Sequence, residues 1–182
     1  DGLSELPQDL VSGDWVVVAT GRAHRPNEFA HARIVEPPQP KTQCPFERLL
    51  PEAMLVYASD GTPEQPTLET RATLEDRWWI QVVPNKYPAL SPSSTCPLPV
   101  ALGPYQWLEG VGFHEVIITR DHERAIAAMS PDEVRAIIRA YRDRYLALKD
   151  EACVAYISIF HNHGREAGAS IWHPHSQLIA IP

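Results

Sequence analysis

The sequence is short of the features that mark membrane, nucleic-acid-binding and disulfide-rich proteins. No stretch of its 182 residues approaches the roughly eighteen consecutive apolar residues of a transmembrane helix, so we expect no membrane contact. A net charge of −7 argues against binding a nucleic acid polymer, although a local group of donors can still bind a small anion. The three cysteines, Cys44, Cys96 and Cys153, are too few and too widely spaced for a disulfide framework. They predict a reducing, cytoplasmic location.

The first residues also lack a feature, the basic and apolar regions of a signal peptide. The segment DGLSELPQDL is acidic and does not begin with methionine. We therefore expect that residue 1 is not the start of translation.

What the sequence does contain is a series of apolar, β-branched segments around one long helical pattern. The segment 88–104 is rich in proline and serine and is predicted to be a loop. Length and the absence of repeats predict a single domain over residues 1–182. This order predicts an α+β fold, an antiparallel sheet with the helix packed on one face. The predicted strands span residues 14–21, 77–85, 112–120, 153–162 and 170–181.

The helical pattern covers residues 130–150 and carries its own start signal. Ser130 is a favourable N-cap, Pro131 suits the first helical position, and Glu133 completes a capping box. Apolar residues then recur at helical spacing and predict one buried stripe. The stripe consists of Val134, Ile137, Ile138, Tyr141 and Tyr145.

The last predicted strand carries an unusual set of polar side chains. Four of the eight histidines lie in residues 161–182. Because side chains alternate along a strand, we expect His173, His175 and Gln177 to share one face. Pro174 cannot donate a ladder hydrogen bond, which predicts an edge position or a local irregularity.

Two histidines on one face are compatible with metal ligands, with catalytic groups, or with surface residues that have no role. The preceding loop favours a functional site, because Gly168 and Ala169 allow close backbone approach while Asn162 and Ser170 offer polar groups. Such a loop can bind phosphate oxygens through backbone N–H groups. Neutral imidazole is a nucleophile toward phosphorus, and a pKa of about 6.5 leaves one ring nitrogen unprotonated at neutral pH. We therefore expect a phosphoryl or nucleotidyl group to pass through one histidine.

The same segment contains a specific pattern, Asn-x-Gly-x-x-x-Gly-x-Ser-x-x-His-Pro-His-x-Gln, which runs from Asn162 to Gln177 without a gap. It resembles the galactose-1-phosphate uridylyltransferases of the histidine-triad superfamily. The segments SGDWVVVATGRAHRP, VVPNKYPAL and HEVIITRDH resemble other parts of that family, in the family's order. The resemblance covers most of the chain and implies half of a duplicated histidine-triad-like α+β structure.

The resemblance implies roles for individual residues. His175 is the expected nucleophile that carries the nucleoside monophosphate, and Gln177 the residue that binds the transferred phosphate. Histidine-triad hydrolases place a third histidine where Gln177 stands, and glutamine cannot deliver a proton, which favours transfer over hydrolysis. The expected substrate-binding residues are Arg22, Arg25, Asn85, Asn162, Gly168, Ala169, Ser170 and Gln177.

The resemblance also implies a structural zinc ion beside the nucleophile. Its expected ligands are Cys44, His122, His173 and Glu47, which stands in CPFE where the family has a second cysteine. A carboxylate can ligate zinc, so this set is feasible. The alternative is a degenerate site without metal, in which Cys44 packs as a small apolar residue.

The remaining cysteines and histidines do not match the resemblance. Cys96 and Cys153 are expected to be buried packing residues. His114, His161 and His163 are expected to support the fold or the site rather than to act in it.

The expected function is exchange of a uridylyl group between UDP-glucose and galactose 1-phosphate through a nucleotidyl-histidine. An alternative is an ADP-sugar or dinucleotide phosphorylase that uses the same histidine with inorganic phosphate. Another is a nucleotide- or zinc-binding half-domain without catalysis. Members of the family are about twice as long and share each site between two subunits, so we expect a truncated or short member, and a homodimer if the second half is present. The base and the sugar stay open.

Overall fold

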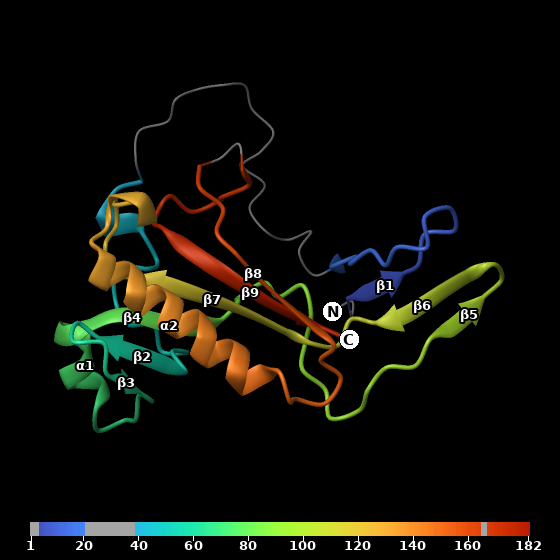
Figure 1. The fold of residues 1–182 in the computed structure, drawn as a ribbon, viewed down its shortest axis with the longest axis horizontal. Helices are drawn as coiled ribbons and strands as arrows, with labels where there is room; N and C mark the ends of the chain where they lie inside the picture. The colour runs from blue at the N-terminus through green and yellow to red at the C-terminus, as the bar shows by residue number, and fades with distance from the viewer. Residues whose placement is uncertain (1–3, 21–38, 165–166) are drawn as a thin grey trace.

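The computed structural model describes residues 4–20, 39–164 and 167–182, which form two antiparallel sheets, a long helix and a short one (Figure 1). No helix in these ranges is long and apolar enough to cross a membrane. The elements in chain order are β1 (Glu5–Pro7), η3 (Lys41–Gln43), β2 (Leu55–Ala58), β3 (Pro63–Glu64), α1 (Arg71–Arg77), β4 (Trp78–Pro84), β5 (Val100–Leu102), β6 (Tyr105–Glu109), β7 (Phe113–Thr119), η4 (Ile126–Ala128), α2 (Pro131–Leu148), β8 (Tyr156–Phe160) and β9 (His175–Ile181).

The larger sheet has six strands in the order β3-β2-β4-β7-β9-β8, and every neighbouring pair is antiparallel. Helix α2 lies along one face of this sheet (Figure 1). The predicted α+β fold, an antiparallel sheet with a long helix on one face, is therefore confirmed. The strands predicted at 77–85, 112–120 and 153–162 are present as β4, β7 and β8.

Helix α2 begins as predicted and buries part of the predicted stripe, since Val134, Ile137 and Tyr141 pack into the core beneath the helix. Ser130 and Glu133 form the complete capping box, in which each side chain accepts a hydrogen bond from the other residue's backbone N–H. Ile138 and Tyr145 are 55% and 45% exposed, so their predicted burial is wrong. The buried residues are Ile137, Ala140 and Leu148. Helical spacing alone permits both neighbouring stripes, and contact with the sheet selects the one that includes the small Ala140.

A largely buried ion pair holds α2 over the sheet. The Arg144 Nε and Nη2 atoms donate to the two carboxylate oxygens of Glu115 on β7, at 2.8 and 2.6 Å. Tyr57 on β2 donates its hydroxyl to Asp143 of the helix at 2.9 Å. A two-pronged guanidinium–carboxylate contact fixes direction as well as distance. These contacts set where the helix lies relative to β7.

The opposite face of the large sheet is covered at its two ends. At one end the segment before β2 and helix α1 pack against it, through a cluster that includes Phe46, Leu49 and Leu74. At the other end lies a cluster of Leu6, Ala89 and Leu90, close to the small sheet β1-β6-β5. On this face the partners of Ile118 and Val116 in the neighbouring strand are His175 and Gln177. The expected site residues thus lie between the two covered ends.

Three predicted segments differ from the structure. Residues 14–20 of the first predicted strand do not form a strand. Among the described residues they make two isolated bridges, Trp15 with Gln8 and Val18 with Glu5. The predicted loop 88–104 contains β5, which forms a hairpin with β6. The last strand begins at His175, not at residue 170, since proline at 174 has no N–H for the ladder.

Cys96 and Cys153 form a disulfide, with their Cα atoms 5.0 Å apart. This contradicts the expectation that both are buried packing residues, and the cytoplasmic location inferred from cysteine content loses that support. The bond ties the loop after β4 to the turn between α2 and β8. Their separation of 57 residues in the chain gave no local signal of the pairing.

Removing this bond is expected to destabilise the fold. In the double substitution Cys96→Ser, Cys153→Ser, the free energy of unfolding should fall by about 4 kcal/mol, because the unfolded chain regains the entropy of a long loop. Denaturant titration measures the change. As a check on the bond itself, the unreduced, unfolded protein should expose one reactive thiol, that of Cys44. Three reactive thiols would contradict the pairing.

Candidate functional site

His175 is the first residue of β9, and its ring is held in one tautomer. Its Nδ1 atom lies 2.8 Å from the main-chain oxygen of His173 and donates a hydrogen bond to it. The lone pair of the neutral ring is therefore on Nε2. The ring of Phe46 packs edge-on against His175, with centroids 5.3 Å apart. The imidazole is thus fixed both in orientation and in the position of its unprotonated nitrogen, Nε2.

Gln177 lies two residues further along β9 and is joined to two other strands. Its Oε1 is 2.9 Å from Nε2 of His114 on β7. Asn85, just after β4, has its Nδ2 3.0 Å from the same His114 nitrogen and accepts a hydrogen bond from the Tyr87 backbone. The structure therefore brings Asn85 and Gln177 together, as two expected substrate-binding residues should be.

The loop between β8 and β9 contains the other expected substrate-binding residues that can be located. Gly164 and Gly168 both have positive φ angles, +78° and +86°, which L side chains rarely adopt. The backbone N–H groups of Ala167 and Ala169 donate to the Gly164 oxygen at 3.2 Å. The Asn162 side chain lies beside Gly168, 3.7 Å from where a Cβ would be. Ser170 follows this segment in the chain, before His175 begins β9.

Two expected nucleotide-binding residues, Arg22 and Arg25, lie outside the described residues.

His161 lies on the face of the sheet opposite to His175, where its Nδ1 is 3.0 Å from the Ser176 hydroxyl. That face carries no expected site residue. The prediction that His161 supports the fold is compatible with this contact.

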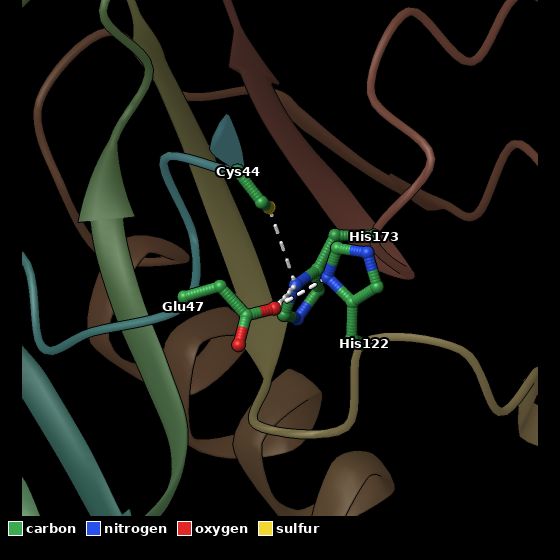
Figure 2. A group of neighbouring side chains, drawn as sticks. All are labelled: Cys44, Glu47, His122 and His173. Atoms are coloured by element: carbon green, nitrogen blue, oxygen red, sulfur yellow. Dashed lines mark hydrogen bonds and ion pairs between the residues drawn. The ribbon is translucent and has the colours of Figure 1, made fainter. Parts of the chain in front are cut away.

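The four expected metal ligands form a cluster. Cys44, Glu47, His122 and His173 each offer one ligand atom, and these atoms lie within 4.8 Å of one another. Figure 2 shows their side chains pointing toward a common point, from the segment before β2, the turn after β7 and the stretch before β9. Cys44 and both histidines are buried, and Glu47 is half-buried. His173 therefore belongs to this cluster and not to the strand, which corrects its expected place beside His175.

The donor atoms of the cluster fit a metal ion. Each histidine gives its Nε2 hydrogen to a backbone oxygen, His122 to Gln39 at 2.7 Å and His173 to Thr119 at 2.5 Å. Their Nδ1 lone pairs therefore face the cluster, as in metal sites whose ligands are oriented by such outer contacts. Glu47 Oε1 contacts His122 Nδ1, yet neither buried atom has a hydrogen-bond partner.

That contact joins two acceptors unless His122 carries a second proton, and a cation between them satisfies both. Burial lowers the pKa of His173, which favours the neutral ligand form. Burial also raises the pKa of the Cys44 thiol, so the thiolate that ligates zinc needs a nearby cation to form. The cluster can hold a metal such as zinc.

Phe46 was missed by the sequence analysis, although it stands inside CPFE between two of the expected metal ligands. Its ring packs edge-on against His173 at 5.8 Å as well as against His175 at 5.3 Å. Its position two residues after Cys44 was the available signal. Phe46 physically connects the metal cluster to the expected nucleophile.

The turn that carries His122 is held by Arg124. Its guanidinium donates to Asp121 at 2.5 Å and to Glu133 at 2.7 Å. Partial burial opposes ionisation of Asp121, but hydrogen bonds from Arg124 and Glu123 still lower its pKa to about 2. The Arg124 hydrogen bonds likewise lower the pKa of Glu133 to about 2. Both carboxylates are thus ionised at neutral pH and fix the turn.

Comparison with known proteins identifies the relatives of this chain. A family model described as "Galactose-1-phosphate uridyl transferase, N-terminal domain" matches residues 7–181. An ADP-glucose phosphorylase from Arabidopsis thaliana is 32% identical, covering 98% of this chain and 48% of its own length. A galactose-1-phosphate uridylyltransferase from Thermotoga maritima is 30% identical, covering 99% and 47%.

A solved structure of a uridylyltransferase shares the fold, with a TM-score of 0.64 and 23% identity over 98% of this chain and 46% of that one. The chain thus spans about half the length of the relatives it matches.

Glu47 is expected to be required for metal binding. Glu47→Ala should weaken zinc binding by more than about tenfold, since loss of outer contacts alone has effects of that size. Glu47→Cys should retain zinc, because it restores a second thiolate. Zinc content by native mass spectrometry, during titration with a chelator, measures both. The exposed Glu52→Ala is the matched control, and unchanged zinc affinity in Glu47→Ala would contradict the assignment.

The Arg124 contacts predict a pH-dependent stability. Carboxylates with depressed folded-state pKa values stabilise the fold above the unfolded pKa of about 4, and this contribution is lost as pH falls toward 2. Arg124→Met should therefore lower the free energy of unfolding at pH 7 and have a shrinking effect below pH 4. Urea titrations at several pH values test this. An equal effect at pH 7 and pH 2 would exclude the ionic explanation.

Proposed function

This chain belongs to the galactose-1-phosphate uridyl transferase family, and we propose that it transfers a nucleoside monophosphate from a nucleotide sugar to a second phosphorylated substrate through His175. The observation that carries the proposal is the hydrogen bond from His175 Nδ1 to the His173 oxygen. It leaves Nε2 unprotonated beside Gln177, on a face that is polar between two apolar clusters.

The transfer takes two displacements. In the first, the Nε2 lone pair of His175 attacks the α-phosphorus, the N–P bond forms, and the bond from phosphorus to the bridging oxygen breaks. Sugar 1-phosphate leaves with that electron pair. The Nδ1–H···O bond to His173 stabilises the positive charge that develops on the ring. In the second step, a phosphate oxygen of the acceptor attacks phosphorus and the N–P bond breaks, which restores neutral His175.

Gln177 and the loop before β9 are proposed to hold the transferred phosphate. A glutamine amino group donates a hydrogen bond to phosphate oxygens without offering a transferable proton. The backbone N–H of Gly168, together with Asn162 and Ser170, is proposed to supply further donors, whereas the N–H groups of Ala167 and Ala169 are bonded to the Gly164 oxygen. Asn85, together with Arg22 and Arg25, is proposed to hold the nucleotide. A site of donors without a general acid favours a phosphorylated acceptor over water.

The metal cluster is proposed to be a structural zinc site. Cys44, Glu47, His122 and His173 would hold the ion, which would link three segments of the chain rigidly and would take no part in the transfer itself. His173 provides both a ligand atom and the carbonyl that orients His175. The cluster is therefore proposed to affect His175 only by fixing the position of the His173 backbone.

Two donor–acceptor pairs are compatible with this chemistry. The first is UDP-glucose with galactose 1-phosphate, in keeping with the family and with the Thermotoga maritima relative. The second is phosphorolysis of ADP-glucose, favoured by the 32% identity to the Arabidopsis thaliana ADP-glucose phosphorylase. Both pass through the same covalent intermediate and differ in the base and in the acceptor. Because the chain spans about half of each relative, turnover is expected to require the rest of such a protein.

The covalent intermediate is the first thing to test. Incubation with UDP-glucose or with ADP-glucose should add one uridylyl or one adenylyl group, and intact mass spectrometry shows which donor reacts. His175→Ala should abolish the adduct, because it removes the nucleophilic nitrogen. The neighbouring exposed His163→Ala is the matched control and should react normally.

The outcomes separate the candidate functions. A uridylyl adduct released by galactose 1-phosphate supports the transferase, and an adenylyl adduct released by inorganic phosphate supports the phosphorylase. An adduct that persists in His175→Ala contradicts the proposed nucleophile. Nucleotide binding without any adduct supports a half-domain that does not catalyse by itself.

A further inference from the structure

His114 is a buried polar residue whose ring contacts three residues around the proposed site, Asn85, Ala89 and Gln177. It lies near the start of β7 and is 5% exposed. Its two ring nitrogens contact different segments, Nδ1 the backbone N–H of Ala89 at 2.9 Å and Nε2 the side chain of Gln177 at 2.9 Å. A histidine that merely fills space needs neither contact. Both contacts together restrict the protonation state of the ring.

The tautomer follows from the Ala89 contact. A backbone N–H can only donate, so Nδ1 of His114 must carry the lone pair. The proton of the neutral ring is then on Nε2, and the doubly protonated form is incompatible with this contact. Asn85 Nδ2 lies 3.0 Å from the same nitrogen but is itself a donor. The acceptor for the His114 proton is therefore Gln177 Oε1.

This hydrogen bond decides which end of the Gln177 carboxamide faces the phosphate. With Oε1 held by His114, the amino group is the end of the Gln177 carboxamide that is left to donate to a ligand. The reversed amide would leave the His114 Nε2 proton without an acceptor, because the Asn85 amino group beside it is also a donor, and it would turn a carbonyl oxygen toward an anion. A donor fixed in this way needs no reorganisation when charge develops on the phosphate.

We propose that His114 is a positioning residue for the transfer: it holds the carboxamide of Gln177 with the amino group directed to the phosphate at His175. The inference rests on the proposed function of His175 for its effect on rate, whereas the tautomer and the orientation of Gln177 do not depend on any reaction. His114 contacts the side chains of both Gln177 and Asn85, and its proposed effect on the transfer runs through Gln177. Its substitution should therefore have no effect where Gln177 is already absent.

The tautomer can be measured directly in the unmodified protein. In ¹⁵N-labelled chain, long-range proton–nitrogen NMR spectra should show His114 protonated at Nε2 and not at Nδ1. Spectra of His114→Gln identify the His114 signals by their loss. Protonation at Nδ1, or at both nitrogens at pH 7, would overturn the proposal whether or not the chain is catalytic.

The effect on transfer is measured as the rate of adduct formation on His175 in a single turnover. His114→Leu should slow this rate by about tenfold to a hundredfold, at the low end of the loss expected when one oriented hydrogen-bond donor is removed. The nucleotide-sugar concentration that gives the half-maximal rate should change little. His114→Gln should lose less, because its amino group can donate near the position of the imidazole Nε2. Equal losses in the two variants would argue against positioning.

A double substitution distinguishes positioning from a general structural role. Gln177→Ala, His114→Leu should react within about twofold of Gln177→Ala alone, because the two residues act as one unit. Independent, multiplying losses would overturn the proposal. If the wild-type chain forms no adduct with either donor, the proposed catalysis fails by itself, and the NMR tautomer still decides the role of His114.

Discussion

The backbone at His173 is the point on which the rest of the site depends. Its side chain completes the metal cluster, its Nε2 is held by the Thr119 oxygen, and its own oxygen receives the Nδ1 hydrogen of His175. Pro174 follows at once and prevents the strand ladder from reaching this residue. Because His173 is outside the ladder, its side chain and carbonyl are both available for these contacts. One short stretch thus joins the cluster that can hold a metal to the carbonyl that sets the tautomer of the His175 ring.

One face of the large sheet is covered by helix α2, and the opposite face carries the proposed site residues. Helix α2 covers one face, held by apolar packing and by the Arg144–Glu115 pair. The other face is covered at both ends and carries His175 and Gln177 between them. Rigid packing on three sides allows a polar site to keep its geometry without being filled by apolar side chains.

Sequence reasoning succeeded where the signal is local and failed where it depends on distant neighbours. The capping box of Ser130 and Glu133 and the cores of β4, β7 and β8 need only nearby residues, and they were predicted. The metal cluster was predicted only through a family resemblance, since Cys44 and His173 are 129 residues apart. The burial of Ile138 was predicted wrongly, because helical spacing does not say which stripe meets the sheet.

The sequence by itself determined helix α2, the cores of β4, β7 and β8, the family, and the run from Asn162 to Gln177 that bears the proposed chemistry. Tertiary structure decided the partners: the disulfide of Cys96 with Cys153, and the hydrogen bond of His114 to Gln177 across 63 residues. The physical reason is that caps and alternation are set within a few residues, whereas these contacts exist only once segments far apart in the chain are brought together, as β7 and β9 are in the sheet.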